Sequence, residues 1–479
     1  MTVDKIKNEN IFKYFIEISK IPRCSLNEKK VADYLEEFAI KNNLEYTRDN
    51  YDNLLIKRNT YSNKTVALQA HIDMVCIKTS DSKHNFDNDP LILTLNDNIL
   101  SAKDTTLGAD NGIGVAYMLA LLEDPKYVGP NLECVFTTNE EEGMTGAEGF
   151  DIASLKSNML INLDSEEEGL LYVSCAGGII CNLSIPISYK LKEGTCYTIN
   201  ISGLKGGHSG LEIDKNRGNA IKFTARVLNY LQEESIQFRI IDIEGGEKHN
   251  AIPVKAKINI MLKDKSQYDS LSAIINNSEN IFRKEYDQRE PETKVTLSAG
   301  IYRNTKVFSN SISNAIIGVL NLLPNGVINM SEDMPNLVET SVNVGKIWTD
   351  LKYINITSSI RSSKNKDINS IVERFNQLKV AFNMTLKTEH PYPAWSYNKH
   401  SKLKETTKEV YKKVYNEELK EIAIHAGLEC GFFANKKADL DIISFGPTIK
   451  DIHTTNEVVD IVSVRNVYLF LNKILAKLK

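Results

Sequence analysis

Hydrophobic positions near the N-terminus recur every three or four residues, which predicts two amphipathic helices within residues 11–40. Phe12, Phe15 and Ile16 mark one face of the first helix, and Pro22 ends that helix. Short apolar runs and a longer helical stretch then alternate at 54–56, 66–70, 91–95, 111–123, 132–136 and 159–163. This alternation predicts an α/β layer with a mixed, largely parallel sheet flanked by helices.

The pattern changes in the middle of the chain. From about residue 184, segments with a period of two alternate with helical ones, which is typical of an α+β domain. The last 80 residues return to helices around a buried apolar strand at 441–445. We therefore expect a discontinuous catalytic domain (1–185 and 392–479) with an inserted α+β lid (186–391). The insert is long enough for two related halves, although their similarity is too faint to establish them.

Composition removes several classes of protein. The chain has 479 residues, 42% of them hydrophobic and 25% charged, so it can bury a core and is not disordered. Its net charge of −4 gives no sign of nucleic-acid or membrane binding, and no apolar run approaches the ~20 residues of a membrane span. Seven cysteines without a C-x-x-C pair indicate reduced thiols rather than disulfides or a thiolate zinc site, and hence a cytoplasmic protein.

Candidate chemistry lies directly after the apolar runs. His71 and Asp73 follow the run 66–70, Glu140 and Glu141 follow 132–136, and Asp164 follows 159–163. Asp451 and His453 come soon after the run 441–445. Because parallel strands bring their carboxyl ends to one edge of a sheet, these groups are expected to converge.

Imidazole and carboxylate groups without thiolates suit Zn²⁺, with Mn²⁺ or Co²⁺ as substitutes, and the pattern predicts a two-metal hydrolase. His71 and Asp73 share a face of an extended segment, so Asp73 can orient His71. Asp110 lies in a Gly-rich turn before a helix, where its carboxylate can bridge two metals. Of the pair Glu140-Glu141, one carboxylate can bind metal while the other acts as general base on water.

Each of these residues also has a simpler interpretation. A single His after a strand is more often a hydrogen-bonded core residue, and the acidic run 140–142 is by itself typical of a solvated loop. The glycines around Asp110 match neither a dinucleotide-binding nor a P-loop motif. Ser209 is not in a G-x-S-x-G elbow, and no cysteine has a nucleophile's setting. The metal hypothesis therefore depends on the residues being taken together.

At this point the motifs resemble a known family, over essentially the whole chain. The segments that carry the resemblance are 69–75 (QAHIDMV), 106–114 (TLGADNGIG), 137–144 (TTNEEEGM), 204–210 (LKGGHSG), 425–431 (HAGLECG) and 453–457 (HTTNE). They are similar to the di-zinc metallopeptidase family that includes carnosinases, aminoacylase, glutamate carboxypeptidase and peptidase T, and most of all to its bacterial dipeptidases.

The resemblance implies two zinc ions per chain. One would be held by His71, Asp110 and Asp164, and the other by Asp110, Glu141 and His453. Asp110 would therefore bridge both ions.

The resemblance also assigns catalytic roles. Glu140 matches the general base and Asp73 the acid that orients His71, although a slip of one residue would exchange Glu140 and Glu141. His208, in the lid, matches a histidine that stabilises the oxyanion. That histidine comes from the same chain in some relatives and from a dimer partner in others.

Three further lid-associated residues match groups that bind substrate. Asn250 and Arg361 resemble groups that bind the substrate's terminal carboxylate, and Gly427 is assigned to substrate binding with them. A guanidinium suits this purpose because it can meet a carboxylate with two hydrogen bonds. Many relatives have Gly-Gly-Thr-Asp where this chain has 426–429, so the roles of His425 and Glu429 stay open.

The resulting expectation is a cytoplasmic metal-dependent dipeptidase. Its substrates would be unblocked dipeptides, Xaa-His dipeptides among them, bound between the catalytic domain and the lid. An N-acyl amino acid deacylase or a tripeptidase on the same scaffold is the alternative, and a non-catalytic metal-binding protein is a more distant one. The partners would be a small peptide and a second copy of the chain through the lid, with neither nucleic acid nor membrane.

Overall fold

The computed structural model describes residues 3–479, which form two compact units. Unit 1 comprises the chain up to Cys175 together with Trp395–Ala423 and Leu428–Lys479. Unit 2 comprises Ala176–Ala394 and Ile424–Gly427. No helix of the described chain is long and apolar enough to cross a membrane.

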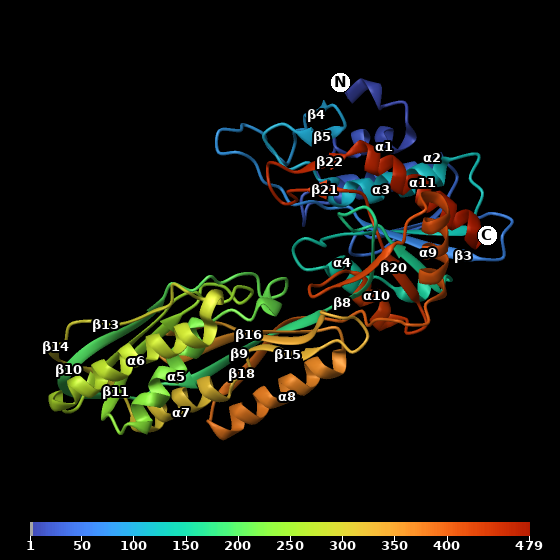
Figure 1. The fold of residues 1–479 in the computed structure, drawn as a ribbon. Coiled ribbons are helices and arrows are strands. Elements are labelled where there is room, and N and C mark those ends of the chain that lie inside the picture. Colours follow the sequence, from blue (N-terminus) through green and yellow to red (C-terminus); the bar gives the residue numbers. More distant parts are fainter. Residues whose placement is uncertain (1–2) are drawn as a thin grey trace. The chain divides into compact units, whose positions relative to one another are not determined.

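Unit 1 is built on an eight-stranded sheet with the order β1-β2-β6-β3-β7-β20-β8-β19 (Figure 1). The strands are β1 (Glu45–Arg48), β2 (Leu54–Arg58), β3 (Thr65–His71), β6 (Asn131–Thr137), β7 (Met159–Asn162), β8 (Leu170–Cys175), β19 (Lys420–Ile424) and β20 (Asp441–Ser444). The four central strands β6, β3, β7 and β20 run parallel, whereas β1, β2 and β8 pair antiparallel with their neighbours. The predicted α/β class with a mixed, largely parallel sheet is confirmed.

Helices pack around this sheet, and a small second sheet completes the unit. The helices are α1 (Asn10–Ile18), α2 (Lys29–Lys41), α3 (Ala109–Glu123), α4 (Thr145–Gly149), α9 (Lys402–Tyr415), α10 (Cys430–Lys436) and α11 (Ile461–Leu478), with short 3₁₀ turns η1 (Val3–Lys5) and η2 (Ile152–Ser154). The small sheet contains β4 (Leu93–Asn96), β5 (Ile99–Ala102), β21 (Ile449–Lys450) and β22 (Val458–Asp460). Helix α3 is buried on every side along 111–122, because it packs between α1 and strand β3.

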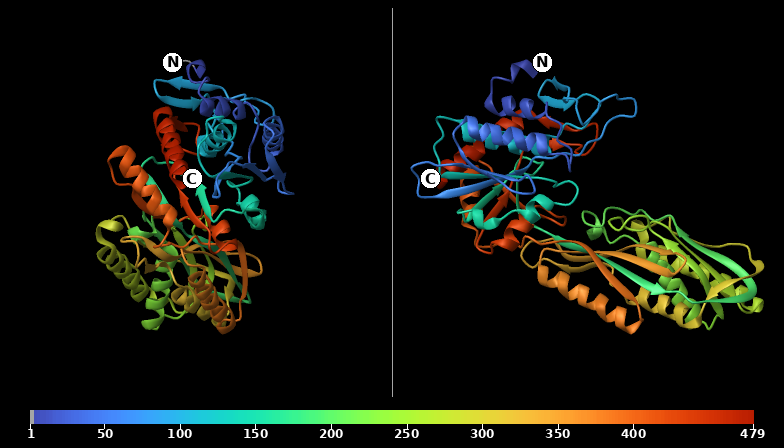
Figure 2. Two further views of the ribbon diagram at one scale, coloured as in Figure 1. Left: turned by 90° about the vertical axis from the view of Figure 1, so that its right-hand side faces the viewer. Right: turned by 180° about the vertical axis from the view of Figure 1, so that it is seen from behind.

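Unit 2 contains a ten-stranded sheet whose pairings are antiparallel. Its strands are β9 (Gly177–Pro186), β10 (Tyr189–Ser202), β11 (Phe238–Gly245), β12 (Ala256–Leu262), β13 (Lys294–Leu297), β14 (Ile301–Phe308), β15 (Gly326–Met330), β16 (Val338–Thr349), β17 (Tyr353–Ser362) and β18 (Thr385–Tyr392). Its helices are α5 (Ala220–Glu233), α6 (Tyr268–Tyr286), α7 (Asn310–Leu322) and α8 (Asn365–Ala381), with 3₁₀ turns η3 (Ile213–Lys215), η4 (Lys265–Gln267) and η5 (Asp287–Arg289). The four helices lie along one face of the sheet (Figures 1 and 2) and bury one continuous apolar core against it.

The order of the strands reveals two related halves in unit 2. The inner half runs β10-α5-β11-β12-α6-β13 and arranges its strands in the order β13-β10-β12-β11. The outer half runs β9-α7-β16-β17-α8-β18, with the order β16-β17-β9-β18. Each half is a βαββαβ motif with its fourth strand beside its first. The second strands of the two halves, β11 and β16, pair antiparallel at Gly245 and Ile347. Along the chain, the inner half lies between the first strand (β9) and the first helix (α7) of the outer half.

The units begin and end at different residues from the predicted domains. We predicted a lid over 186–391, whereas unit 2 already includes all of β9 and continues to Ala394. The predicted second part of the catalytic domain, 392–479, contains Ile424–Gly427, which clusters with unit 2. The N–H of Ala176 donates to the carbonyls of Ile424 and Ala426, which holds this short segment in unit 2.

Candidate metal centre and lid residues

The predicted metal ligands of unit 1 lie in contact with one another. The Asp110 carboxylate lies between two histidines: its Oδ1 is 3.0 Å from His71 Nε2 and its Oδ2 is 3.2 Å from His453 Nε2. Asp164 Oδ1 is 3.4 Å from His71 Nε2, and Glu141 Oε2 is 2.9 Å from His453 Nε2. Of the two adjacent glutamates, it is Glu141 that contacts a histidine. The shared Asp110 carboxylate thus divides the cluster into two groups of three.

The chemistry of this cluster fits metal ions. His71, Asp110 and Glu141 each offer a donor atom within 4.8 Å of the others. Glu141 Oε1 is buried and has no hydrogen-bond partner. Two imidazoles against several close carboxylates leave an excess of negative charge that a divalent cation would balance, and nitrogen and oxygen donors of this kind suit zinc.

The electrostatics of the cluster shift the titration of its members. Hydrogen bonds to Asp110 and Glu141 raise the pKa of His453 to about 10. Burial lowers the pKa of His71, but Asp164 and the other carboxylates outweigh it and the pKa is well above its usual value. Burial raises the pKa of Asp164 to about 6 and that of Glu140 well above its ordinary range. Glu140 therefore holds a proton more readily than a solvated glutamate.

Asp73 connects the histidine to the acidic turn. Its Oδ1 is 3.3 Å from His71 Nδ1, and its two oxygens accept the backbone N–H groups of Glu140 and Glu141 at 3.1 and 3.3 Å. Ser25 Oγ donates to Asp73 Oδ2 at 2.8 Å. The carboxylate is fully buried, so its backbone contacts fix the start of the 140–143 turn beside the His71 ring.

Two residues that received no role from the sequence hold the loop before Asp110. Glu457 accepts the backbone N–H groups of Leu107, Gly108 and Ala109 at 2.8–3.0 Å. Arg23, which is 2% exposed, donates to the carbonyls of Ile72, Asp73 and Gly108. The sequence contained one hint for Glu457, its place at the end of the HTTNE segment, and none for Arg23.

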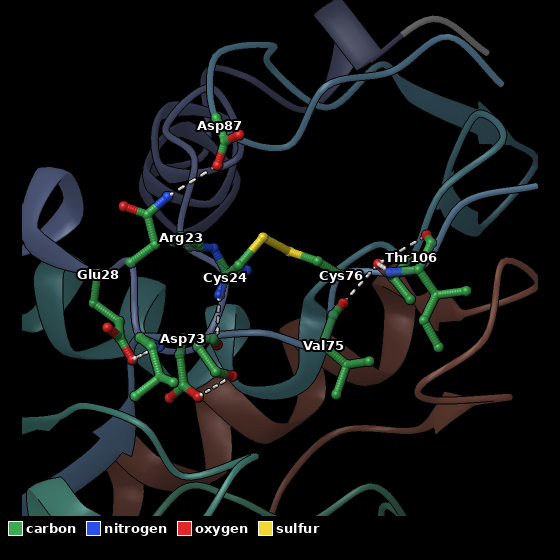
Figure 3. Close-up of a disulfide and its surroundings, with 12 residues drawn as sticks. Arg23, Cys24, Glu28, Asp73, Val75, Cys76, Asp87 and Thr106 are labelled. Carbon is green, nitrogen blue, oxygen red and sulfur yellow. Dashed lines mark hydrogen bonds between the residues drawn. A yellow bond between two sulfur atoms is a disulfide. The ribbon is translucent and has the colours of Figure 1, made fainter.

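The prediction of reduced cysteines is wrong for one pair. Cys24 and Cys76, 52 residues apart in sequence, form a disulfide beside Asp73 (Figure 3). A backbone bridge between Cys24 and Met74 brings the two segments together, and sequence spacing alone cannot reveal such a contact. The other five cysteines are free, as predicted, and all are buried.

The predicted lid residues in unit 2 form a second group, around the guanidinium of Arg361. The Nδ1 atom of His208 accepts the N–H groups of Gly210 and Leu211 at 3.3 and 3.1 Å, which leaves the proton of the neutral ring on Nε2. Arg361 Nη1 donates to the Tyr392 hydroxyl at 2.7 Å, and its Nε is buried without a partner. Burial lowers the pKa of His208, and the charge of Arg361 lowers it further.

His425, which the sequence left without a role, belongs to the same group. Its Nε2 lies 2.7 Å from Ser341 Oγ. Burial, with a contribution from Arg361, lowers its pKa to about 3. The neighbouring Gly427 lies in the same short segment of unit 2, and the carbonyl of Asn250 accepts the N–H of Ser209 next to His208. Tyr392 and Ser341 are contacts that the sequence analysis missed, because single hydroxyl residues on strands carry no motif.

The comparison with family models decides the classification. The model of peptidase family M20/M25/M40 matches residues 67–477, which is most of the chain. The chain belongs to this family. It is therefore a hydrolase that acts on peptide bonds, as predicted, and the family implies a metal cofactor for which the cluster at His71, Asp110 and Glu141 is the candidate site.

Individual relatives agree over the full length. The chain is 34% identical to the cytosol non-specific dipeptidase of Escherichia coli strain K12, over 99% of both chains. It is similar to the crystal structure of aminoacylhistidine dipeptidase from Vibrio alginolyticus, with a TM-score of 0.94 and 32% identity over 100% of this chain and 98% of that one. Aminopeptidase PepT from Bacillus cereus, at 14% identity and a TM-score of 0.57 over 98% of both chains, shares the fold. The resemblance inferred from the motifs is confirmed.

Proposed function

We propose that this member of the M20/M25/M40 family is a di-zinc dipeptidase that hydrolyses unblocked dipeptides, with Xaa-His dipeptides among its substrates. The observation that carries the proposal is the Asp110 carboxylate, whose two oxygens each face a different histidine. His71, Asp110 and Asp164 would hold one zinc ion, and Asp110, Glu141 and His453 the other. The names of the full-length relatives support the substrate class.

Bound zinc would polarise the scissile carbonyl and make water more acidic. Glu140 then acts as the general base: it takes a proton from the attacking water and passes it to the leaving amine. Its burial supports this role, because the raised pKa makes the protonated form accessible between the two transfers. Asp73 keeps Glu140 in position through the backbone N–H that it accepts.

The groups of unit 2 would bind and stabilise the substrate. The Nε2–H of His208 donates to the oxyanion of the tetrahedral intermediate, which its tautomer supports. Arg361, with Asn250 and Gly427, binds the terminal carboxylate.

The experiment combines metal analysis with assays of purified protein. We expect about two zinc ions per chain, and cleavage of β-alanyl-histidine and of a leucyl dipeptide that a chelator abolishes and zinc restores. A tripeptide and an N-acetyl amino acid serve as the comparison substrates. Preferred cleavage of either would favour the tripeptidase or deacylase alternative, and protein without metal or cleavage would contradict the proposal.

Two further parts of the proposal concern the protein's setting. The name of the Escherichia coli relative supports a cytosolic location. A homodimer through unit 2 is also part of the proposal, and Leu191 and Tyr302 are exposed apolar side chains on the same face of the paired strands β10 and β14. Analytical ultracentrifugation of the wild type and of Leu191→Lys with Tyr302→Lys tests it, since the double variant should sediment as a monomer.

A further inference from the structure

Near the strand ends that lead to the metal centre, unit 1 contains a group of polar side chains that the mechanism does not use. Gln69 on β3, Thr137 on β6, Asn162 on β7 and Glu429 immediately before α10 are all fully buried. Strand β3 ends at His71, and β6 and β7 end shortly before Glu140 and Asp164. Buried polar groups are rarely placed without partners, so their contacts show what they do.

The four side chains are joined by short hydrogen bonds. Glu429 Oε2 accepts from Gln69 Nε2 at 2.6 Å and from Thr137 Oγ1 at 2.8 Å. Gln69 Oε1 accepts from Asn162 Nδ2 at 2.5 Å. A single carboxylate oxygen therefore ties β3 to β6, and the Gln69 amide ties β3 to β7.

The members of this group lie next to the predicted ligands along each strand. Gln69 is two residues before His71, and Thr137 is the residue that faces His71 across the β3–β6 pair. Asn162 is two residues before Asp164, and its Oδ1 accepts the Asp164 N–H at 3.3 Å. A change in this group would therefore shift the strand ends that carry His71 and Asp164.

Burial, together with the nearby carboxylates of Asp164 and Asp73, raises the pKa of Glu429 to about 8, and His71 and the hydrogen bond from Thr137 act in the opposite direction. Glu429 Oε1 is buried without a hydrogen-bond partner, so a proton on that oxygen would have no acceptor. Oε2 already accepts two hydrogen bonds, which favour the ionised form against the effect of burial. Within residues 3–479, Glu429 forms no ion pair with Lys or Arg, and a buried charge of this kind needs a compensating one.

We propose that Glu429 is a positioning residue of the metal centre: it holds the ends of β3 and β6 at the spacing that the metal ligands require, and its charge is balanced by the bound cations. The inference rests on the proposed function, since it requires that the centre binds metal. Residues of this kind around metal sites typically change metal affinity about 10- to 100-fold when they are replaced.

The test measures zinc affinity of the full-length, metal-free protein by competition with a chromophoric chelator. Glu429→Gln keeps the shape of the side chain and removes its charge, and we expect zinc affinity to fall about 10-fold or more. Glu133→Gln is the matched control, because Glu133 is a buried carboxylate on the same strand β6 as Thr137 and accepts only the N–H groups of Lys156 and Ser157. Unchanged zinc affinity in Glu429→Gln would overturn the proposal.

A second pair of variants keeps the test valid if Glu429→Gln does not fold. Thr137→Val removes one donor to Oε2 at nearly constant volume, and Thr137→Ser keeps it. We expect weaker zinc binding in Thr137→Val, wild-type affinity in Thr137→Ser, and the same melting temperature for both in metal-free form. Equal zinc affinity in the two variants would overturn the positioning role. Wild-type protein that binds no zinc would instead contradict the proposed function itself.

Discussion

The two units of this chain hold opposite kinds of chemistry. In unit 1 the candidate centre is acidic: Asp110, Asp164 and Glu141 surround His71 and His453, and buried carboxylates and one arginine hold the loops around them. In unit 2 the corresponding group contains the guanidinium of Arg361 and two histidines whose pKa values are lowered, and it is held by hydroxyl groups of Tyr392 and Ser341. In the proposed reaction, unit 1 would therefore bind cations and transfer protons, and unit 2 would recognise the anionic end of the substrate.

The largest effect that this division predicts is the loss of the proton carrier in unit 1. Glu140→Gln should lower kcat by a factor of about 10²–10⁴, because general acid–base catalysis contributes that much. Zinc content should stay near that of the wild type, which elemental analysis measures. Glu142→Gln, a change at the exposed neighbour, is the control. Loss of metal in Glu140→Gln would show that Glu140 is a ligand and not the base.

Covalent bonding also differs between the units, since the Cys24–Cys76 disulfide belongs to unit 1 and the cysteines of unit 2 are free. Closing a loop of this length should stabilise unit 1 by about 4 kcal/mol through the entropy of the unfolded chain. Each unit contains one of the two tryptophans, Trp395 in unit 1 and Trp348 in unit 2. Dithiothreitol should therefore lower the unfolding midpoint of Trp348→Phe protein, in which Trp395 reports on unit 1.

The control for this prediction is a variant with both Cys24→Ser and Cys76→Ser, whose unfolding should not respond to the reductant. Trp395→Phe protein, in which Trp348 reports on unit 2, should respond little. Equal shifts at both tryptophans would mean that the two units unfold as one, and the comparison between them would fail for stability.

Recognition of an anion by unit 2 gives the next effect in size. Arg361→Ala should lower kcat/KM for a dipeptide with a free carboxylate about 10- to 100-fold, as expected for the loss of hydrogen bonds to a charged group. The dipeptide C-terminal amide should be a poor substrate for the wild type and lose little more in the variant. Arg374→Ala, at an exposed arginine on α8, is the control. An equal loss for dipeptide and amide would assign Arg361 a structural role.

The smallest effect concerns pH and the buried His425. Its folded-state pKa of about 3 lies below the usual value, so the unfolded chain binds a proton first as the pH falls. Stability from this residue is fully present above about pH 6.5 and decreases by about 1.4 kcal/mol for each pH unit below it. Urea unfolding followed at Trp348 measures this slope. His425→Gln should be less steep between pH 6.5 and 5, and an unchanged slope would show that other groups cause it.

Much of unit 1 was predictable because its signals are local in sequence. Strands β3, β6 and β7 are continuous apolar runs, and the groups of the centre follow them within a few residues, so the convergence of parallel strand ends was enough to bring together His71, Glu141 and Asp164. The contacts of Arg23 and Glu457 were not predictable. They depend on backbone groups from distant segments, and a buried arginine or glutamate looks like any surface charge in the sequence.

In unit 2, too, local patterns could be predicted from the sequence, whereas long-range pairing of strands could not. The period-two pattern from about residue 184 indicated strands in this unit, such as β11 and β17, because alternation is a property of neighbouring residues. The two nested halves depend on which strands pair, and pairing is decided by contacts across long stretches of chain. For the same reason, the sequence could not show that His425 lies in unit 2 while Glu429, four residues later, lies in unit 1.

The nesting of the halves sets an order of events during synthesis of the chain. The inner half is continuous from β10 to β13, so every strand it needs has been made once residue 297 leaves the ribosome. Strand β9 precedes it, yet pairs with β17 and β18, which are made last in the unit. Until then both edges of β9 are unpaired, although every strand of the inner half has been made. A nascent chain arrested near residue 350 should therefore contain a paired inner half and an exposed β9, the form of this protein that most needs a chaperone.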